Sequence, residues 1–381
     1  MKGTSKRLLL FHFLFSAAAL SCTGDGTGPT ARTLEERLQA ALDEGFAGTE
    51  GKGLSVAVLV PGRSMWTGVA GVSHDDVPIT PRTAFGAGSI TKTFTALTVL
   101  RLAEEGYLSL DDSLHSWLPD YPHVDHDITI RQLLNHTSGL SDFVDVPGWI
   151  IPLLQEQNRV WGMEEYFLET IREPYFEKGT GWSYSTSGYI LLRMIIELAS
   201  GGTVGAQYRE YVIDPLELSD TYVCPYDPLP ADWAHGWLDI TGDDVYDDFS
   251  IIPTTSWCSA VGGAVYTTPT DLTKLGDALM HERTLLDDPS YDEMTDFYYP
   301  SGHDEPMVYG YGLGLLWFNR SLVSGETVWG HAGNAPGYAA AVLYMVDHGV
   351  VVSLMDNTEY GEAMIVVDGI FDVVTDYMGS H

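Results

Sequence analysis

Hydrophobic positions divide the chain into two kinds of region. Both ends contain apolar runs with strand character, at 54–60, 65–70, 309–317, 327–331, 339–346 and 350–355. Such continuous runs are typical of a sheet that is covered on both faces. The segments 34–42 and 364–377 have helical periodicity and are predicted to supply part of that cover. We therefore expect the first and last parts of the chain to share one sheet.

The middle of the chain has a different texture. Short helical segments, such as 130–134 and 189–196, are separated by clusters of Pro, Gly and Asp. We read 108–252 as a mostly helical lobe inserted into a discontinuous α/β lobe, 32–107 and 253–381. The fold class is then α/β (α+β), and the two lobes together make one unit without internal repeats.

One helix, starting at or just before Ser89, is apolar almost all round. Lys92 is the only charged side chain from Ser89 to Leu100, and Gly106 is a plausible stop. Residues three apart share a helix face, so the Lys92 amine can reach the Ser89 hydroxyl. Burial lowers the pKa of a lysine, which makes a neutral amine available as a base. The pair therefore has the composition of a nucleophile with its base.

The pattern Ser-x-x-Lys is so short that it occurs by chance in many sequences. Beyond the N-terminal leader, however, the lysines are few: Lys52, Lys92, Lys178 and Lys274. A serine stands three residues before Lys92 alone. A lone lysine within an apolar helix also needs a reason to be there. We therefore favour the catalytic interpretation of Ser89 and Lys92.

The N-terminus has the pattern of an export signal. Basic residues precede an apolar run from Leu8 to Leu20 that is too short to span a membrane comfortably, so 1–21 is predicted to be a signal peptide. Cys22 follows a sequence similar to a bacterial lipobox and is the predicted lipid anchor, with 22–31 as a flexible tether. The alternative is plain secretion with cleavage near 17–19. Both interpretations place the protein outside the cytoplasm, as a periplasmic or cell-surface protein of a bacterium.

Charge and composition exclude some functions. The formal net charge of −34 excludes nucleic acid as a partner. The acidic excess fits a saline environment or simply a soluble surface, and no function is inferred from it. The loop 123–127 contains His and Asp but lacks a further ligand set, so no metal or other cofactor is predicted. Cys224 and Cys258 are left as a possible disulfide in an oxidising compartment.

Several stretches occur together in the order of a known family. They are 89–92 (SITK), 128–140 (ITIRQLLNHTSGL), 179–185 (GTGWSYS), 260–268 (AVGGAVYTT) and 330–333 (GHAG). From about residue 35 onward the chain resembles the serine hydrolases related to class C β-lactamases, D-alanyl-D-alanine carboxypeptidases and their esterase relatives. The resemblance implies a β-lactamase/transpeptidase-like fold, in which an antiparallel sheet is covered by helices and carries an inserted helical lobe.

The resemblance also implies roles for single residues. Tyr184 matches the tyrosine of the family motif Y-x-N and would relay protons between Lys92, Ser89 and the leaving group. The family asparagine is here Thr186, which lacks the amide that donates to a substrate carbonyl. This change puts ordinary β-lactam turnover in doubt.

The motif His331-Ala332-Gly333 stands where β-lactamases have Lys-Thr-Gly. The His331 ring is expected to donate toward Tyr184 or the substrate. Gly333 lets the substrate approach the backbone, and the amides of Asn334 and Ser89 would form the oxyanion hole. Arg320 is the nearest basic candidate for holding a substrate carboxylate. His136, in the stretch 128–140, is expected to be structural.

The sequence thus predicts a serine hydrolase that acts through an acyl-enzyme on an ester or amide, like an esterase or a D-alanyl-D-alanine carboxypeptidase. Its partner would be a small molecule, namely an ester, a D-amino-acid peptide or a β-lactam. We expect a monomer that contacts a membrane only through its N-terminal anchor. A class C-type β-lactamase is the enzymatic alternative. A non-catalytic, anchored cell-wall-binding protein is the alternative from another class, although a pure binder has no need of an activated nucleophile.

Overall fold

The computed structural model describes residues 32–156, 158–239, 245–251, 254–298, 308–319, 323, 325–358 and 363–380. The predicted signal peptide, tether and Cys22 lie outside these residues, as does Arg320. The predicted lobe boundaries near 108 and 252 stay a prediction.

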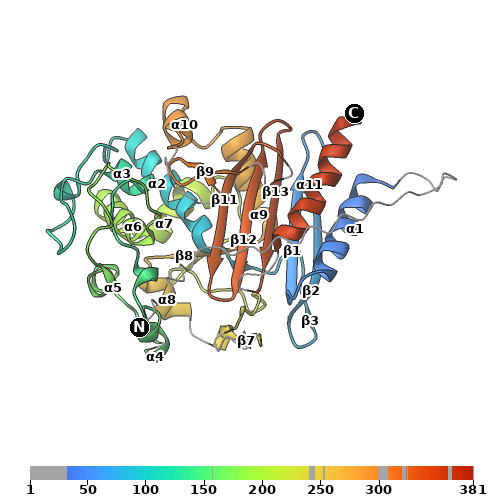
Figure 1. Cartoon of the computed structure of the whole chain (residues 1–381), viewed down its shortest axis with the longest axis horizontal. Coiled ribbons are helices and arrows are strands. Elements are labelled where there is room, and N and C mark those ends of the chain that lie inside the picture. The colour runs from blue at the N-terminus through green and yellow to red at the C-terminus, as the bar shows by residue number, and fades with distance from the viewer. Residues whose placement is uncertain are drawn as a thin grey trace, which may run out of the picture.

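An eight-stranded antiparallel sheet forms the centre of the molecule (Figure 1). Its strands follow the order β3-β2-β1-β13-β12-β11-β10-β9. In chain order they are β1 Gly53–Leu59, β2 Trp66–His74, β3 Val77–Pro78, β9 Val308–Tyr311, β10 Leu316–Phe318, β11 Val328–Ala335, β12 Tyr338–Met345 and β13 Val350–Asp356. The first strand pairs with the last, with Val58 opposite Val352. The prediction that both ends of the chain share one sheet is therefore confirmed.

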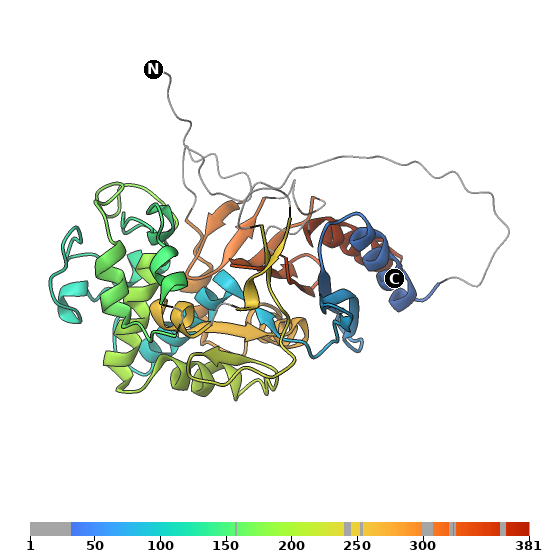
Figure 2. The same cartoon turned by 90° about the horizontal axis from the view of Figure 1, so that it is seen from below.

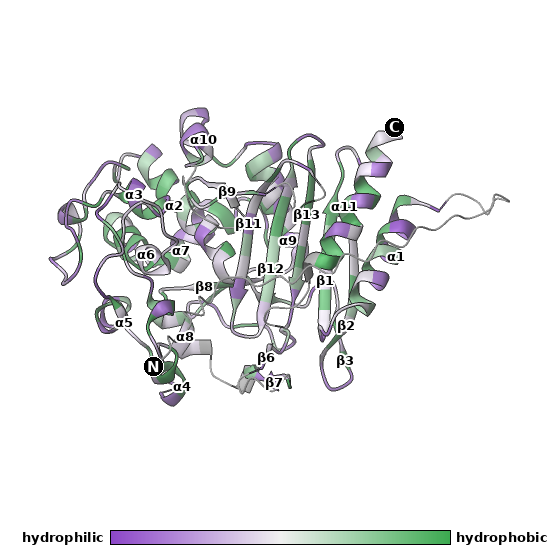
Figure 3. Cartoon of the chain, in the orientation of Figure 1, coloured by the Kyte–Doolittle hydropathy of each residue, from purple (hydrophilic) through white to green (hydrophobic). Residues whose placement is uncertain are grey.

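Helices cover both faces of this sheet. Helices α1 (Leu34–Ala47) and α11 (Ala363–Gly379) pack together on one face, and α9 (Pro269–Gly276) packs on the other. Successive residues of β13 therefore enter opposite cores, with Val351 on the side of α9 and Val352 on the side of α1 and α11. Figure 3 shows hydrophobic residues along the central strands and mixed hydrophobic and hydrophilic residues along the two outer helices. Burial on both faces explains the continuous apolar runs in the sequence.

The predicted single strand 309–317 is wrong. The structure divides it into β9 and β10, joined by a turn that contains Gly312 and Gly314. Gly314 has a φ of 73°, and a Cβ there would lie 2.5 Å from the Cβ of Ala96. Its carbonyl accepts a hydrogen bond of 2.8 Å from the Thr93 hydroxyl. The turn thus fixes the sheet edge against the helix that carries Lys92.

The remaining helices gather at the end of the molecule away from α1 and α11 (Figure 2). They are α2 Thr91–Glu104, α3 Ile130–Leu134, α4 Ile151–Gln155, α5 Met163–Thr170, α6 Thr186–Ser200, α7 Val204–Tyr208, α8 Thr254–Ala260 and α10 Asp288–Thr295. Short helical turns lie between them, at η1 Gly88–Ile90, η2 Leu114–Ser116, η3 Phe143–Asp145, η4 Arg209–Ile213, η5 Phe249–Ile251 and η6 Asp277–His281. Two small sheets complete the fold, β4 (Phe85–Gly86), β8 (Ala264–Thr267) and β5 (Tyr222–Cys224) in one, and β6 (Trp237–Leu238) with β7 (Asp247–Asp248) in the other.

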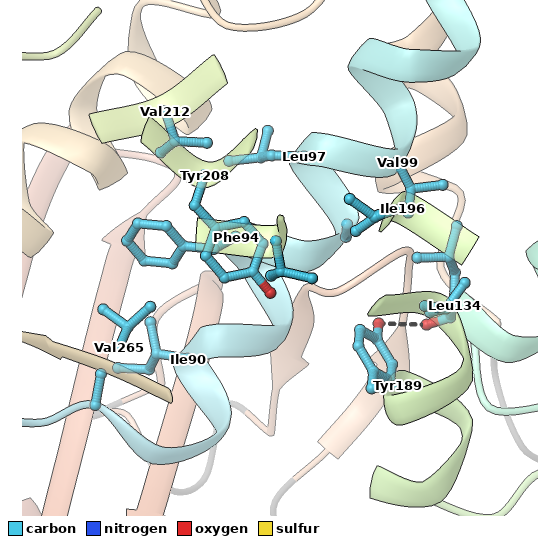
Figure 4. Close-up of a cluster of buried hydrophobic side chains, with 14 of the residues drawn as sticks. Ile90, Phe94, Leu97, Val99, Leu134, Tyr189, Ile196, Tyr208, Val212 and Val265 are labelled. Carbon is cyan, nitrogen blue, oxygen red and sulfur yellow. Dashed lines mark hydrogen bonds between the residues drawn. The ribbon is translucent and has the colours of Figure 1, made fainter. Parts of the chain in front are cut away.

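Helix α2 is buried in the middle of this helical region. Its apolar side chains, including Phe94 and Leu97, pack against Tyr208 and Val212 of α7 and η4 (Figure 4). The predicted helix is confirmed, except that Ser89 itself lies in the 3-10 turn η1 just before the α-helix. Gly106 follows the helix with a φ of 76°, a conformation that favours glycine at a helix end.

Among the described residues, no single helix has both the length and the hydropathy needed to cross a membrane. Helix α6 passes that test only when combined with 204–213, and the two parts are bent by 82°.

Candidate active site

Two glycines allow strand β11 to approach the turn that carries Ser89. A Cβ on Gly333 would lie 2.0 Å from the Ala87 carbonyl oxygen and 3.0 Å from the Ser89 nitrogen. A Cβ on Gly88 would lie 2.7 Å from the Asn334 nitrogen. Only glycine fits such contacts between backbones. The Asn334 amide is thereby held beside the Ser89 turn, as the predicted oxyanion hole requires.

Ser89 and Lys92 are in contact, as their spacing predicts. The Lys92 Nζ donates to the Ser89 Oγ at 3.2 Å and to the Thr186 Oγ1 at 3.3 Å. The Lys92 side chain is buried, with 2% of the residue exposed. Burial lowers the pKa of Lys92 to about 7; the Asp142 carboxylate opposes this shift and the Arg193 guanidinium adds to it. A substantial fraction of neutral amine is therefore present near neutral pH.

Tyr184 lies next to both groups. The Lys92 Nζ is 4.6 Å from the centroid of the Tyr184 ring. Burial raises the pKa of Tyr184 well above its ordinary value, and a hydrogen bond with the Ser89 side chain opposes part of that rise. The phenol therefore keeps its proton at neutral pH. It is suited to donating this proton to a leaving group, with Lys92 as the base.

His331 does not have the role that the sequence suggests. Its Nδ1 donates to the Ala332 carbonyl at 2.6 Å, so its Nε2 is left to accept from the Tyr311 hydroxyl at 3.0 Å. Burial lowers the pKa of His331 to about 3, which keeps the ring neutral. Both ring nitrogens are used, and no proton is left to donate toward Tyr184 or a substrate. His331 therefore holds Tyr311 in place, and Tyr311 packs against Tyr184, with 5.9 Å between the two ring centroids.

His136 is structural, as expected. Its Nδ1 accepts from the Ser185 amide at 3.1 Å, and its ring centroid lies 4.3 Å from that of Tyr184. Burial lowers the pKa of His136 well below its ordinary value. A neutral His136 thus holds the segment that carries Tyr184 and Thr186.

Two charged residues of the site were missed in the sequence. Asp142 is buried, accepts from the Thr186 amide at 2.8 Å, and has a pKa raised by burial. Arg193 is also buried and lies on α6. Arg193 gives a signal like that of Lys92, because it is the only charge in the apolar run 189–196. Asp142 lies two residues after the stretch 128–140 and has no such signal.

These groups surround a cavity of about 170 Å³. Its polar lining includes Ser89, Thr91, Lys92, Asp142, Tyr184, Thr186, Arg193 and Asn334. A smaller apolar pocket of about 40 Å³ adjoins it and shares the walls Trp257, Tyr266 and Ala335. The site therefore combines a nucleophile, a base and a proton donor with an apolar surface for part of a substrate.

Cys224 and Cys258 are not bonded to each other in the structure. Both are buried thiols. Burial raises the pKa of Cys258 well above its ordinary value, and a hydrogen bond with the Cys224 side chain adds to that rise. The possible disulfide is thus absent, although the two residues predicted to pair do lie together.

The loop 123–127 does not converge on a metal site. His123 faces Glu173 at 2.9 Å and His126 faces Asp120 at 3.3 Å, so the two imidazoles point to separate partners. Within the part of the chain that the structure describes, only Asp277, His281 and Glu282 bring ligand atoms within 4.8 Å of one another. They belong to η6 and its end, and His281 contacts both carboxylates.

Comparisons with known proteins confirm the family that the sequence motifs resemble. The Beta-lactamase family model matches residues 36–374. Penicillin-binding protein 4* of Bacillus subtilis is 27% identical over 76% of this chain and 64% of its own length. Esterase EstB of Burkholderia gladioli is 29% identical over 50% of this chain and 52% of its own length. The chain thus matches between half and two thirds of these two relatives.

A solved structure matches nearly the whole fold. The D-stereospecific amidohydrolase of a Streptomyces species superposes with a TM-score of 0.76 at 29% identity. The match covers 88% of this chain and 98% of that protein.

Proposed function

The chain belongs to the beta-lactamase family, and from this premise we propose that it is a serine hydrolase that cleaves esters or amides through an acyl-enzyme. One observation carries the proposal. In a cavity open to a small molecule, the Ser89 hydroxyl accepts a hydrogen bond of 3.2 Å from a buried lysine whose pKa is lowered to about 7. A neutral amine in that position is a base for the serine proton.

The reaction would proceed in two steps. Ser89 Oγ attacks the substrate carbonyl carbon while Lys92 takes its proton, and the amides of Ser89 and Asn334 stabilise the oxyanion. Tyr184 donates a proton to the leaving alcohol or amine and is reprotonated from Lys92. Water then attacks the acyl-enzyme, with the same groups moving protons in the reverse direction.

The substrate class is proposed at the level of small esters and amides. The similarity to an esterase and to a D-stereospecific amidohydrolase supports both bonds and suggests D-amino-acid amides. Thr186, in the place of the family asparagine, offers the Lys92 amine a hydroxyl and cannot donate an amide N–H to a substrate. A class C-type β-lactamase is therefore the less favoured alternative. A non-catalytic cell-wall-binding protein would leave the lowered pKa of Lys92 without a use.

Intact-mass spectrometry tests the mechanism directly. The protein without residues 1–21, and its Ser89→Ala variant, are incubated with a penicillin, a short acyl ester, and D- and L-phenylalanine amide. A lasting penicilloyl adduct that needs Ser89 indicates a carboxypeptidase-like enzyme, whereas rapid ester or amide turnover without an adduct indicates a hydrolase of the esterase or amidase type. Turnover by Ser89→Ala would contradict the acyl-enzyme mechanism. If no serine-directed acylating probe forms an adduct with the wild type, the non-catalytic binding protein would be favoured.

We also propose that the protein is exported and anchored through a lipid on Cys22. The sequence pattern of 1–31 supports this. Labelling of cells with radioactive palmitate should mark the full chain but not its Cys22→Ala variant. Release of an unlabelled wild-type protein into the medium would instead indicate plain secretion.

A further inference from the structure

Arg193 is a buried cation in the wall of the catalytic cavity. It lies on α6, two turns after Thr186, and only 2% of the residue is exposed. Its Nη1 donates to the Val261 carbonyl at 2.5 Å and its Nε donates to the Tyr208 hydroxyl at 3.3 Å. The Tyr208 hydroxyl is held in turn by Thr95 of α2 at 2.6 Å. Hydrogen bonds to two separate segments, one of which is itself held by α2, thus fix the position of the guanidinium.

Within the described part of the chain, this cation has no anionic partner. Arg193 takes part in none of the ion pairs found among the described residues, and its Nη2 has no hydrogen-bond partner there. An arginine remains charged in a protein interior, and a buried charge is costly unless an opposite charge or hydrogen bonds compensate for it. Two carbonyl or hydroxyl acceptors supply only part of that compensation.

Asp142 is not the missing partner. It lines the same cavity, but its Oδ2 accepts from the Thr186 amide at 2.8 Å and its Oδ1 accepts from the Val144 amide at 3.5 Å. Its carboxylate is therefore held by the backbone at the ends of η3 and α6. The free N–H groups of Arg193 remain available to a ligand that enters the cavity.

We propose that Arg193 makes the catalytic cavity a binding site for a small monovalent anion, held by the Nη2 group. A guanidinium suits a carboxylate or a halide, because it offers parallel N–H donors and a full charge. Two sources of this chemistry fit, namely a free inorganic anion and a carboxylate carried by the substrate. The site itself is independent of the proposed hydrolase function, whereas its use by a substrate carboxylate rests on that function.

Anion binding is tested first without any turnover. Crystals of the protein soaked in sodium bromide should show an anomalous peak within hydrogen-bonding distance of Arg193 Nη2. In solution, sodium formate should raise the melting temperature of the wild type and of Arg193→Lys, but not of the uncharged Arg193→Met. Arg82→Met is the control for a lost surface charge, because its side chain is 75% exposed and pairs with Asp220.

The two sources are separated with a pair of esters of equal acyl length, 4-nitrophenyl hexanoate and mono-4-nitrophenyl adipate. If the substrate supplies the carboxylate, Arg193→Met should lower kcat/KM for the adipate relative to the hexanoate by about tenfold or more, and bromide should inhibit only adipate hydrolysis. If a free anion is bound, the ratio between the esters should stay the same in all variants while bromide binding still depends on Arg193.

Absence of a bromide peak at Arg193, together with the same effect of formate on the wild type and Arg193→Met, would overturn the anion site. The wild-type bromide measurement decides the question even if Arg193→Met does not fold. Failure of the wild type to hydrolyse either ester would count against the proposed function and would leave the bromide result valid.

Discussion

Two walls of the candidate catalytic cavity differ in the chemical groups that they contribute. The helical wall, η1 with the start of α2, places Ser89 and Lys92 together through a spacing of three residues. The strand wall, β11, contributes a close backbone approach at Gly333 and a histidine turned to Tyr311. The comparison indicates that one wall would supply reactive side chains, whereas the other would supply one backbone amide, that of Asn334, and structural support.

Replacing Lys92 should have the largest effect that separates the two walls. Lys92→Met keeps the apolar volume but removes the base, so kcat/KM should fall by about a thousandfold or more. Lys178→Met is the matched control. This lysine is paired with Asp125 at the surface, so its replacement should leave kcat/KM nearly unchanged. Stopped-flow and steady-state assays with one ester measure both. A double variant with Ser89→Ala that is no slower than Ser89→Ala alone would show that the two residues act as a unit.

Replacing Gly333 tests the strand wall. In Gly333→Ala the new Cβ meets the Ala87 oxygen at 2.0 Å, so the backbone beside Ser89 must move. Loss of one oxyanion donor costs about a hundredfold to a thousandfold in kcat, and we expect a fall of that size. Gly369→Ala on α11 is the control, since its nearest neighbour would be an ordinary contact at 3.6 Å. Unchanged kcat in a folded Gly333→Ala protein would show that β11 does not form the oxyanion hole.

The pH dependence should report the ionisation of Lys92, on the helical wall. Because neutral Lys92 is the base and its pKa is lowered to about 7, kcat/KM should rise with pH through a midpoint near 7. The Asp142 carboxylate raises the pKa of Lys92, so Asp142→Asn should move that midpoint to lower pH, whereas loss of the Arg193 charge should move it to higher pH. The amide of Asn still accepts from the Thr186 backbone. A midpoint that stays in place in both variants would mean that Lys92 does not set the profile.

Local spacing explains what the sequence could predict. The contact of Ser89 with Lys92, the hairpin of β1 and β2, and the paired β12 and β13 all depend on neighbours in the sequence or on a continuous apolar pattern. The break at Gly312 and Gly314 was missed because it depends on α2, which lies far away in the chain.

Side-chain direction in the strand wall depends on a distant partner in the same way. The sequence correctly predicts that His331 lies on a strand beside Gly333. No neighbouring residue indicates its hydrogen bond with Tyr311 of β9. Asp142 likewise becomes a site residue only when α6 brings the Thr186 amide to it. The orientation of these groups is a tertiary property, which short motifs do not record.

The smallest effect on activity is expected from the contact between Tyr311 and His331. Tyr311→Phe leaves the buried His331 Nε2 without its donor, which should cost about 1–3 kcal/mol in the free energy of unfolding. Because His331 is already neutral, with a pKa lowered to about 3, kcat/KM should change by less than about tenfold and its pH midpoint should not move. Tyr309→Phe is the control on the same strand, because that side chain is exposed and should affect neither stability nor rate. Urea unfolding and the pH profile of ester hydrolysis measure the two quantities. A shifted midpoint in Tyr311→Phe would show that protons do pass through the strand wall, and the division between a reactive wall and a supporting wall would then fail.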